Sequence, residues 1–166
     1  MKNNSTLDIT PGARLLRMLG NIELKGWQCI AELIDNSIDG LIESENQNRK
    51  IEVYIPTEGE LNNNSKPVSI KDNGKGMNKE ILENALTAGY SNRDSTGDSL
   101  GLFGVGFNVA SARLGDKVVV RTSQKDMDYD IVATIDLLLL VQKSKDTKDK
   151  KTTIPINIEN KTFKES

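Results

Sequence analysis

The sequence contains no histidine, and its single cysteine is Cys29. The absence of histidine excludes every mechanism that needs a catalytic imidazole and every zinc site built on that residue. One cysteine cannot form an intramolecular disulfide, which fits a reducing compartment, and we expect a cytoplasmic location. Aromatic residues make up only 4 % of the chain, too few for the stacking platforms that bind single-stranded nucleic acid.

Long apolar runs and excess charge of one sign are also missing. No hydrophobic stretch reaches the length of a membrane-spanning helix, and the polar start MKNNST is no signal peptide, so we expect no membrane contact. The 22 basic and 24 acidic residues give a net charge of −2, which argues against a surface that binds nucleic acid all over. The length of 166 residues suits one domain with a sizeable core.

Hydrophobic periodicity predicts a mixture of helices and strands. Helices are expected at about 10–23, 27–45, 78–86 and 105–115, and strands at 51–55, 67–72, 117–123, 128–136 and 152–159. Residues 59–67 have turn chemistry, and residues 143–151 form a solvated charged loop. Pro155 places the last strand near a sheet edge, because proline cannot donate a ladder hydrogen bond. Trp27 and Cys29 are expected to pack the second helix.

The stretch AELIDNSIDG, residues 31–40, places several polar side chains in an otherwise apolar helix. Residues four apart share a helix face, so Glu32 and Asn36 lie together. A carboxylate there can deprotonate a water, and an amide oxygen suits a hard cation such as magnesium. We count Asp39, one turn further along, among the nucleotide-contacting candidates. The alternative for this helix is an exposed polar face without a ligand.

Two glycine-rich segments also have features of a nucleotide-binding site. DNGKGM, residues 72–77, places an acid at a strand end before two glycines, and GLFGVGF, residues 101–107, places three glycines just before a helix. Glycines let backbone N–H groups approach a phosphate, and a helix N-terminus favours its negative charge. Neither segment has the Gly-Lys-Ser/Thr ending of a P-loop. Each alone is equally typical of a tight turn; together with the helix they favour a nucleotide site in which Asp72 accepts a hydrogen bond from the base.

The ordered set ELIDNSIDG, DNGKGM and GLFGVGF resembles the nucleotide-binding motifs of the gyrase, chaperone, histidine-kinase and MutL superfamily, known as GHKL. The resemblance extends from about Thr10 to Ile158. It implies an α/β (α+β) two-layer sandwich, in which a mixed, mostly antiparallel sheet has helices on one face. It also implies a single domain over residues 1–166, with ATP or ADP and Mg²⁺ between the helices and a flexible lid.

The resemblance also implies a role for each matching residue. Glu32 matches the general base, Asn36 the magnesium ligand and Asp72 the acid that binds adenine. The other implied nucleotide-binding positions are Gly74, Gly76 and Met77 in the base loop, Gly101, Leu102, Phe103, Gly104, Val105, Gly106 and Phe107 in the phosphate loop and lid hinge, and Thr152. The residue before Thr152 is Lys151, where the family usually has glycine.

Within the superfamily, the motifs are most similar to the MORC and chaperone branches, including bacterial MORC-like ATPases. Histidine kinases typically have asparagine at the position of Glu32, so this carboxylate favours hydrolysis. The branch implies that Mg-ATP drives closure of a lid over residues 91–99 and ATP-dependent homodimerisation. The client, whether DNA or protein, is not identified by the sequence.

Hydrolysing members of the superfamily contact the γ-phosphate with a lysine or arginine from a following domain. The sequence ends at Ser166, just past the last expected strand, so we expect either a fragment of a longer protein or a binding domain that awaits a partner, and very slow hydrolysis by this domain alone. Lys75 and Arg93 are in-chain alternatives for that cation, although both have the character of solvated loop charges. Three other functions stay open: a nucleotide-binding regulatory module without turnover, a kinase-branch phosphotransferase, and a domain whose glycine loops are purely structural.

Overall fold

The computed structural model describes residues 5–8, 23–63, 66–87, 106–139 and 153–161. The strands are β1 (Ser5–Asp8), β2 (Ile51–Tyr54), β3 (Ser69–Asp72), β4 (Lys117–Thr122), β5 (Tyr129–Asp136) and β6 (Thr153–Asn160). The helices are α2 (Gly26–Ile42), α3 (Glu58–Asn62), α4 (Lys79–Leu86) and α5 (Gly106–Leu114). The predicted helix at 10–23 and the predicted charged loop at 143–151 lie outside the described residues.

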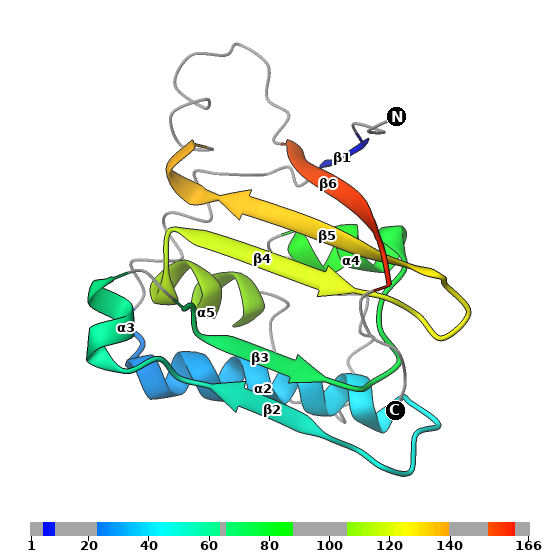
Figure 1. Cartoon of the computed structure of the whole chain (residues 1–166), viewed down its shortest axis with the longest axis horizontal. Coiled ribbons are helices and arrows are strands. Elements are labelled where there is room, and N and C mark those ends of the chain that lie inside the picture. Colours follow the sequence, from blue (N-terminus) through cyan, green and yellow to red (C-terminus); the bar gives the residue numbers. More distant parts are fainter. Residues whose placement is uncertain (1–4, 9–22, 64–65, 88–105, 140–152, 162–166) are drawn as a thin grey trace.

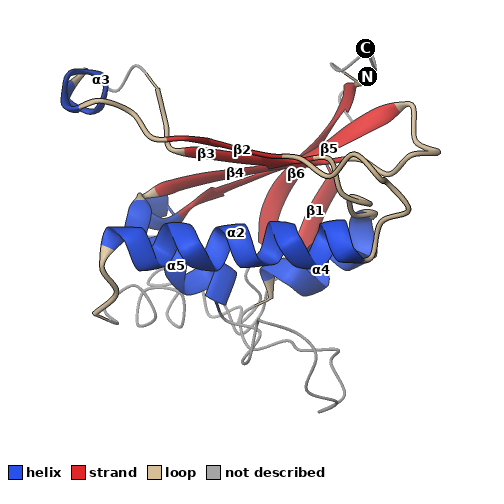
Figure 2. Cartoon of the chain, turned by 90° about the horizontal axis from the view of Figure 1, so that it is seen from below, coloured by secondary structure: helices blue, strands red, loops and turns tan. Residues whose placement is uncertain are grey.

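The fold consists of a layer of strands and a layer of helices. The strands form a four-stranded sheet in the order β1-β6-β5-β4 and a two-stranded sheet of β2 and β3. All four pairings between described strands are antiparallel. Helices α2, α4 and α5 lie on one face of the strands, with β3 beside β4 (Figures 1 and 2). The predicted two-layer α/β fold with a mostly antiparallel sheet is therefore confirmed.

The core lies between the four-stranded sheet and α4. Successive side chains of a strand point to opposite faces, so alternate residues of β5 and β6 are buried together. Leu82 and Leu86, four residues apart on α4, reach the same cluster. The buried members are Leu7, Leu82, Leu86, Ile131, Ala133, Ile135, Ile154 and Ile156. This cluster fixes the strands on which the candidate site is built.

Two described elements were not predicted. Helix α3 occupies part of the segment predicted as a turn, and a reciprocal cap starts it: Thr57 Oγ1 accepts from the N–H of Glu60 at 3.4 Å, while Glu60 Oε2 accepts from the N–H of Thr57 at 2.9 Å. Strand β1 pairs along β6, with Thr6 opposite Pro155. Strand β6 is therefore one strand in from the edge, and the edge itself is β1.

Helix α2 begins and ends close to the predicted limits. Cys29 is fully buried, as expected, and burial raises the pKa of its thiol. Trp27 was predicted to pack the helix, but it lies in the first turn of α2 and 67 % of its surface is exposed. None of the described helices is long and apolar enough to cross a membrane.

Candidate functional site

One face of α2 presents the polar residues of the AELIDNSIDG stretch. Glu32, Asn36 and Gly40 recur every four residues, with Asp39 beside Gly40, so they follow one another along the helix. The side-chain amide of Asn36 donates to the backbone oxygen of Glu32 at 2.8 Å, which turns its Oδ1 away from the helix axis. At the helical rise of 1.5 Å per residue, Glu32 and Gly40 are about 12 Å apart. This face therefore has two distinct ends.

At the Gly40 end, α2 touches the loop that follows β3. The N–H of Lys75 donates to the backbone oxygen of Gly40 at 3.3 Å. A Cβ on Gly74 would stand 2.9 Å from both the carbonyl carbon and the carbonyl oxygen of Gly40. Backbone therefore meets backbone here, and a side chain at position 74 would push the loop away from the helix.

Asp72 lies at the end of β3 and directs this loop. Its Oδ1 accepts a hydrogen bond from the N–H of Gly74 at 2.9 Å, the closure of an Asx turn. The carboxylate is exposed, and its other oxygen is the one that remains for a ligand. One side chain thus shapes the loop and offers an acceptor beside it, as its predicted contact with a base amino group requires.

The second half of the loop rests on the end of β4. Gly76 has φ +66°, and a Cβ there would stand 1.9 Å from the carbonyl oxygen of Ser123, so only glycine fits. The N–H of Met77 donates to Thr122 Oγ1 at 2.8 Å, and Met77 packs against the core. The position of the base loop is therefore set by the four-stranded sheet as well as by α2.

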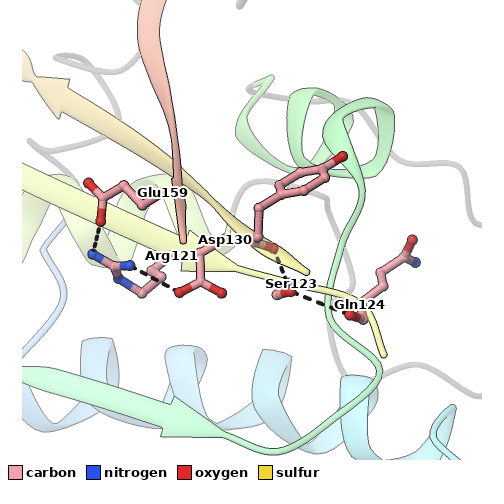
Figure 3. A network of polar contacts seen from close by, with 6 residues as sticks. Arg121, Ser123, Gln124, Asp130 and Glu159 are labelled. Atoms are coloured by element: carbon pink, nitrogen blue, oxygen red, sulfur yellow. Dashed lines mark hydrogen bonds and ion pairs between the residues drawn. The ribbon is translucent and has the colours of Figure 1, made fainter. Parts of the chain in front are cut away.

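Polar contacts hold that end of the sheet together (Figure 3). Arg121 Nη1 donates to Asp130 Oδ2 at 3.0 Å and Nη2 donates to Glu159 Oε2 at 2.5 Å, so one guanidinium joins β4, β5 and β6. The two carboxylates, Asp130 first, raise the pKa of Arg121. Ser123 Oγ donates to the backbone oxygen of Tyr129 at 2.8 Å and closes the β4–β5 turn. Hydrogen bonds and ion pairs to β5 and β6 therefore hold the end of β4 that Gly76 contacts.

At the other end of the face, Glu32 meets the first residue of α5. A Cβ on Gly106 would stand 2.5 Å from Glu32 Oε2. The carboxylate therefore lies at a helix N-terminus, where backbone N–H groups favour negative charge. Phe107 is half-buried and packs against the core. Along α2 the structure thus brings Gly40 against the loop of the second motif and Glu32 against Gly106 of the third.

Several predicted positions lie outside the described residues, and some supporting residues had not been predicted. The first group is Gly101, Leu102, Phe103, Gly104, Val105 and Thr152, together with Arg93 and the lid residues 91–99. The second group is Gly40, Thr122 and Ser123, which act through backbone or hydroxyl contacts that no local pattern reveals. Lys75, one of the two in-chain cations considered for the γ-phosphate, forms an exposed ion pair with Glu43.

The arrangement suits a magnesium nucleotide. Within the described ranges there is no cluster of three or more His, Cys, Asp or Glu that could hold a metal by itself. Magnesium is usually bound by one or two protein ligands plus substrate phosphates and water, which matches the single amide oxygen of Asn36. Near the start of α5, Asn108 is only 2 % exposed, and its Nδ2 has no hydrogen-bond partner among the described residues. This amide lies on the core side of α5, beside Val118 and Ile135, so it offers no donor to the polar face of α2.

A polar helix face that contacts the loop after β3 at one end and the start of α5 at the other, beneath an antiparallel sheet, is consistent with a nucleotide-binding domain. Residues 24–165 match the family described as histidine kinase-, DNA gyrase B-, and HSP90-like ATPase, and the chain belongs to that family. The predicted membership of the GHKL superfamily is therefore confirmed.

The chain is also similar to curated relatives of two kinds. It is 34 % identical over 90 residues to Protein MICRORCHIDIA 4 of Arabidopsis thaliana, a match covering 54 % of this chain and 11 % of that protein. Protein MICRORCHIDIA 5 of the same plant is 33 % identical over 100 residues, 60 % of this chain and 13 % of that protein. A probable C4-dicarboxylate sensor kinase of Halalkalibacterium halodurans is 35 % identical over 74 residues, 45 % of this chain and 13 % of that protein. The matches thus span about an eighth of each relative's length.

Proposed function

We propose that this domain binds Mg-ATP along the polar face of α2 and hydrolyses it, with the base at the Gly40 end and the phosphates at the Glu32 end. The observation that supports this orientation is the pair of contacts at the two ends of the face. Gly40 touches the Asp72 loop, and Glu32 touches the start of α5. These two contacts support a base bound near Asp72 and phosphates bound near the start of α5.

Glu32 is proposed as the general base of the hydrolysis. Its carboxylate would accept a proton from the water that attacks the γ-phosphate, a contribution of about 10²–10⁴-fold in rate. Asn36 would ligate magnesium through Oδ1, and the bound ion would neutralise phosphate charge. Asp72 would accept a hydrogen bond from the adenine amino group through the oxygen that the Asx turn leaves open.

The sensor-kinase relative supports a second candidate, a phosphotransferase of the kinase branch. Glu32 argues against it, because phosphate transfer to a protein side chain needs no carboxylate to activate water. A regulatory module that binds ATP without turnover is the third candidate. Release of inorganic phosphate distinguishes the first function from the third, and labelling of a protein by γ-³²P-ATP would identify the second.

Larger-scale behaviour is proposed from the family alone. We propose that ATP closes a lid formed by the segment around residues 91–99 and favours a homodimer of the whole protein. The chain covers 11 % and 13 % of the two MICRORCHIDIA relatives described above, so the behaviour of the whole protein is part of this proposal. The client on which ATP turnover would act, DNA or protein, is a further open part of the proposal.

Calorimetry and phosphate release test the proposed function together. The wild type should bind ATP more tightly with magnesium than without it, and Asn36→Ala should abolish that difference. Adenosine, which reaches only the base loop, should bind Asn36→Ala and wild type equally. Glu32→Ala should keep its ATP affinity and lower phosphate release by about 10²–10⁴-fold. Magnesium-independent binding by the wild type, or undiminished turnover by Glu32→Ala, would overturn the corresponding assignment.

A further inference from the structure

Gly106 and Glu32 make a contact that differs from those of the other glycines. Among the described residues outside its own helix and chain neighbours, a Cβ at position 106 would have two atoms within 4 Å, Glu32 Oε2 at 2.5 Å and Glu32 Cδ at 3.6 Å. Added Cβ atoms at Gly74 and Gly76 would instead collide with backbone, of Gly40 and Ser123 respectively. Among the glycines that the structure describes, Gly106 is thus the one whose close neighbours all belong to a single side chain.

The nature of that neighbour decides what an alanine at this position would do. Backbone atoms cannot retreat without moving an element, but a glutamate carboxylate can rotate away. The backbone of Gly106 is also helical, with no left-handed φ, so alanine is conformationally acceptable there. An ordinary contact begins near 3.4 Å, and the carboxylate would therefore have to retreat by about 1 Å. The fold would accommodate the methyl group, but the Glu32 carboxylate would have to move.

We propose that Gly106 is a positioning residue for Glu32: because it has no Cβ, it leaves the space in which the carboxylate stands beside the N-terminus of α5. This inference rests on the proposed function, in which that carboxylate activates water, and it gives Gly106 a task other than approach to a phosphate. A misplacement of about 1 Å at a reacting group costs roughly 10²-fold in rate. Substrate affinity depends on other contacts, at Asp72 and Asn36.

The test compares Gly106→Ala with a matched control, Gly26→Ala. Gly26 begins α2 as Gly106 begins α5, and a Cβ there meets nothing within 4 Å. Gly106→Ala should keep the ATP affinity of the wild type in calorimetry and lower kcat for phosphate release about 10²-fold. Gly26→Ala should change neither. A parallel loss of ATP affinity in Gly106→Ala would overturn the proposal, because it would place the glycine against the nucleotide itself.

A double variant separates action through Glu32 from independent action. If Gly106 works only by positioning the carboxylate, Gly106→Ala should cause no further loss once Glu32 has become alanine. Phosphate release by Glu32→Ala and by the double variant should then be equal. Multiplied losses in the double variant would show that Gly106 contributes by another route.

NMR supplies a measure that needs neither ATP nor turnover. In the wild-type background, Glu32→Ala should shift the backbone amide signals of Gly106 and Phe107, because a charge next to them disappears. In the Gly106→Ala background the same substitution should shift them less, since the carboxylate has already moved. No shift at Gly106 in Glu32→Ala would overturn the contact, even if Gly106→Ala failed to fold. If Glu32→Ala produces these shifts but the wild type binds no ATP, the proposed function would be contradicted and the contact would still be established.

Discussion

At the scale of single residues, the two oxygens of Asp72 have different tasks. Oδ1 is used by the Asx turn with Gly74, so in the proposed site the loop shape and the ligand contact would come from different atoms of one carboxylate. Replacement by alanine would remove both and could not distinguish them. Asparagine separates them, because it retains an oxygen for the turn and replaces the other oxygen with an NH₂ donor.

Asp72→Asn should therefore keep the fold and lose adenine recognition. A hydrogen bond to a charged group contributes about 1.5–3 kcal/mol, so ATP should bind roughly tenfold to a hundredfold more weakly. GTP should gain relative to ATP, since the new NH₂ group can donate to the guanine carbonyl. Calorimetry with both nucleotides measures this preference, and Asp126→Asn, an exposed site in the β4–β5 turn, is the matched control. An unchanged ratio of the two affinities would count against Asp72 as the base acceptor.

At the scale of elements, α3 depends on one carboxylate. Glu60 accepts from the N–H and Oγ1 of Thr57 at 2.9 and 3.0 Å. The pKa of Glu60 is lowered from 4.5 to about 2, chiefly by the Tyr54 hydroxyl and then by Thr57 and Lys66. Because the pKa in the folded state lies below the usual value, the stabilisation is complete above pH 4.5 and is lost as the pH falls toward 2.

Acid should therefore unwind α3 before the core unfolds. The Cα chemical shifts of the helix should move toward coil values between pH 4.5 and 2 in the wild type. In Glu60→Gln the helical Cα chemical shifts of α3 should be partly lost already at neutral pH, and they should change little more on acidification. Glu58→Gln, in the same first turn, should keep the wild-type profile. Helical shifts that persist at pH 2 would show that the Glu60 contacts do not hold this helix.

Three strands meet at Arg121, and the two carboxylates that it binds differ in burial. Asp130 is 3 % exposed, whereas the Glu159 side chain is 43 % exposed. Removing the cation leaves a buried carboxylate without this partner, which costs about 1–3 kcal/mol, while an exposed ion pair contributes under about 1 kcal/mol. The same strand end supports Gly76 through the Ser123 carbonyl, so damage here should reach the base loop.

Arg121→Met should accordingly lower the free energy of unfolding by about 1–3 kcal/mol, and Glu159→Gln by less than about 1 kcal/mol. Urea denaturation with unchanged m-values measures both. Adding Asp130→Asn to Arg121→Met should recover part of the loss, because the buried charge is removed. ATP should also bind less tightly to Arg121→Met. Equal losses in the two single variants would contradict the dominant role of the buried partner.

At the scale of the whole molecule, the sequence predicted the elements better than the contacts between them. Periodicity located α2, α4 and α5, and the Asn78 cap of α4 is confirmed, since Asn78 Oδ1 accepts from Ile81 N at 2.9 Å. Helix α3 has only five residues, too few for a periodic signal, and β1, with the sequence STLD, has a single apolar residue and so no alternation to detect. The contacts of Gly40 and Ser123 had no sequence signal, because they join backbones from distant parts of the chain.

The contacts at Gly40 and at Glu32 give the site two ends, and ligands of different length should distinguish them. Adenosine reaches only the base end, so it should slow amide exchange in residues 72–77 alone. ADP should add little protection at the start of α5, whereas ATP with magnesium should protect residues 106–109 as well. Exchange measured by mass spectrometry on Glu32→Ala, in which turnover is blocked, would show whether protection spreads in this order. Equal protection at both ends by adenosine would mean that the two segments respond as one unit, and the proposed alignment of ATP along α2 would be wrong.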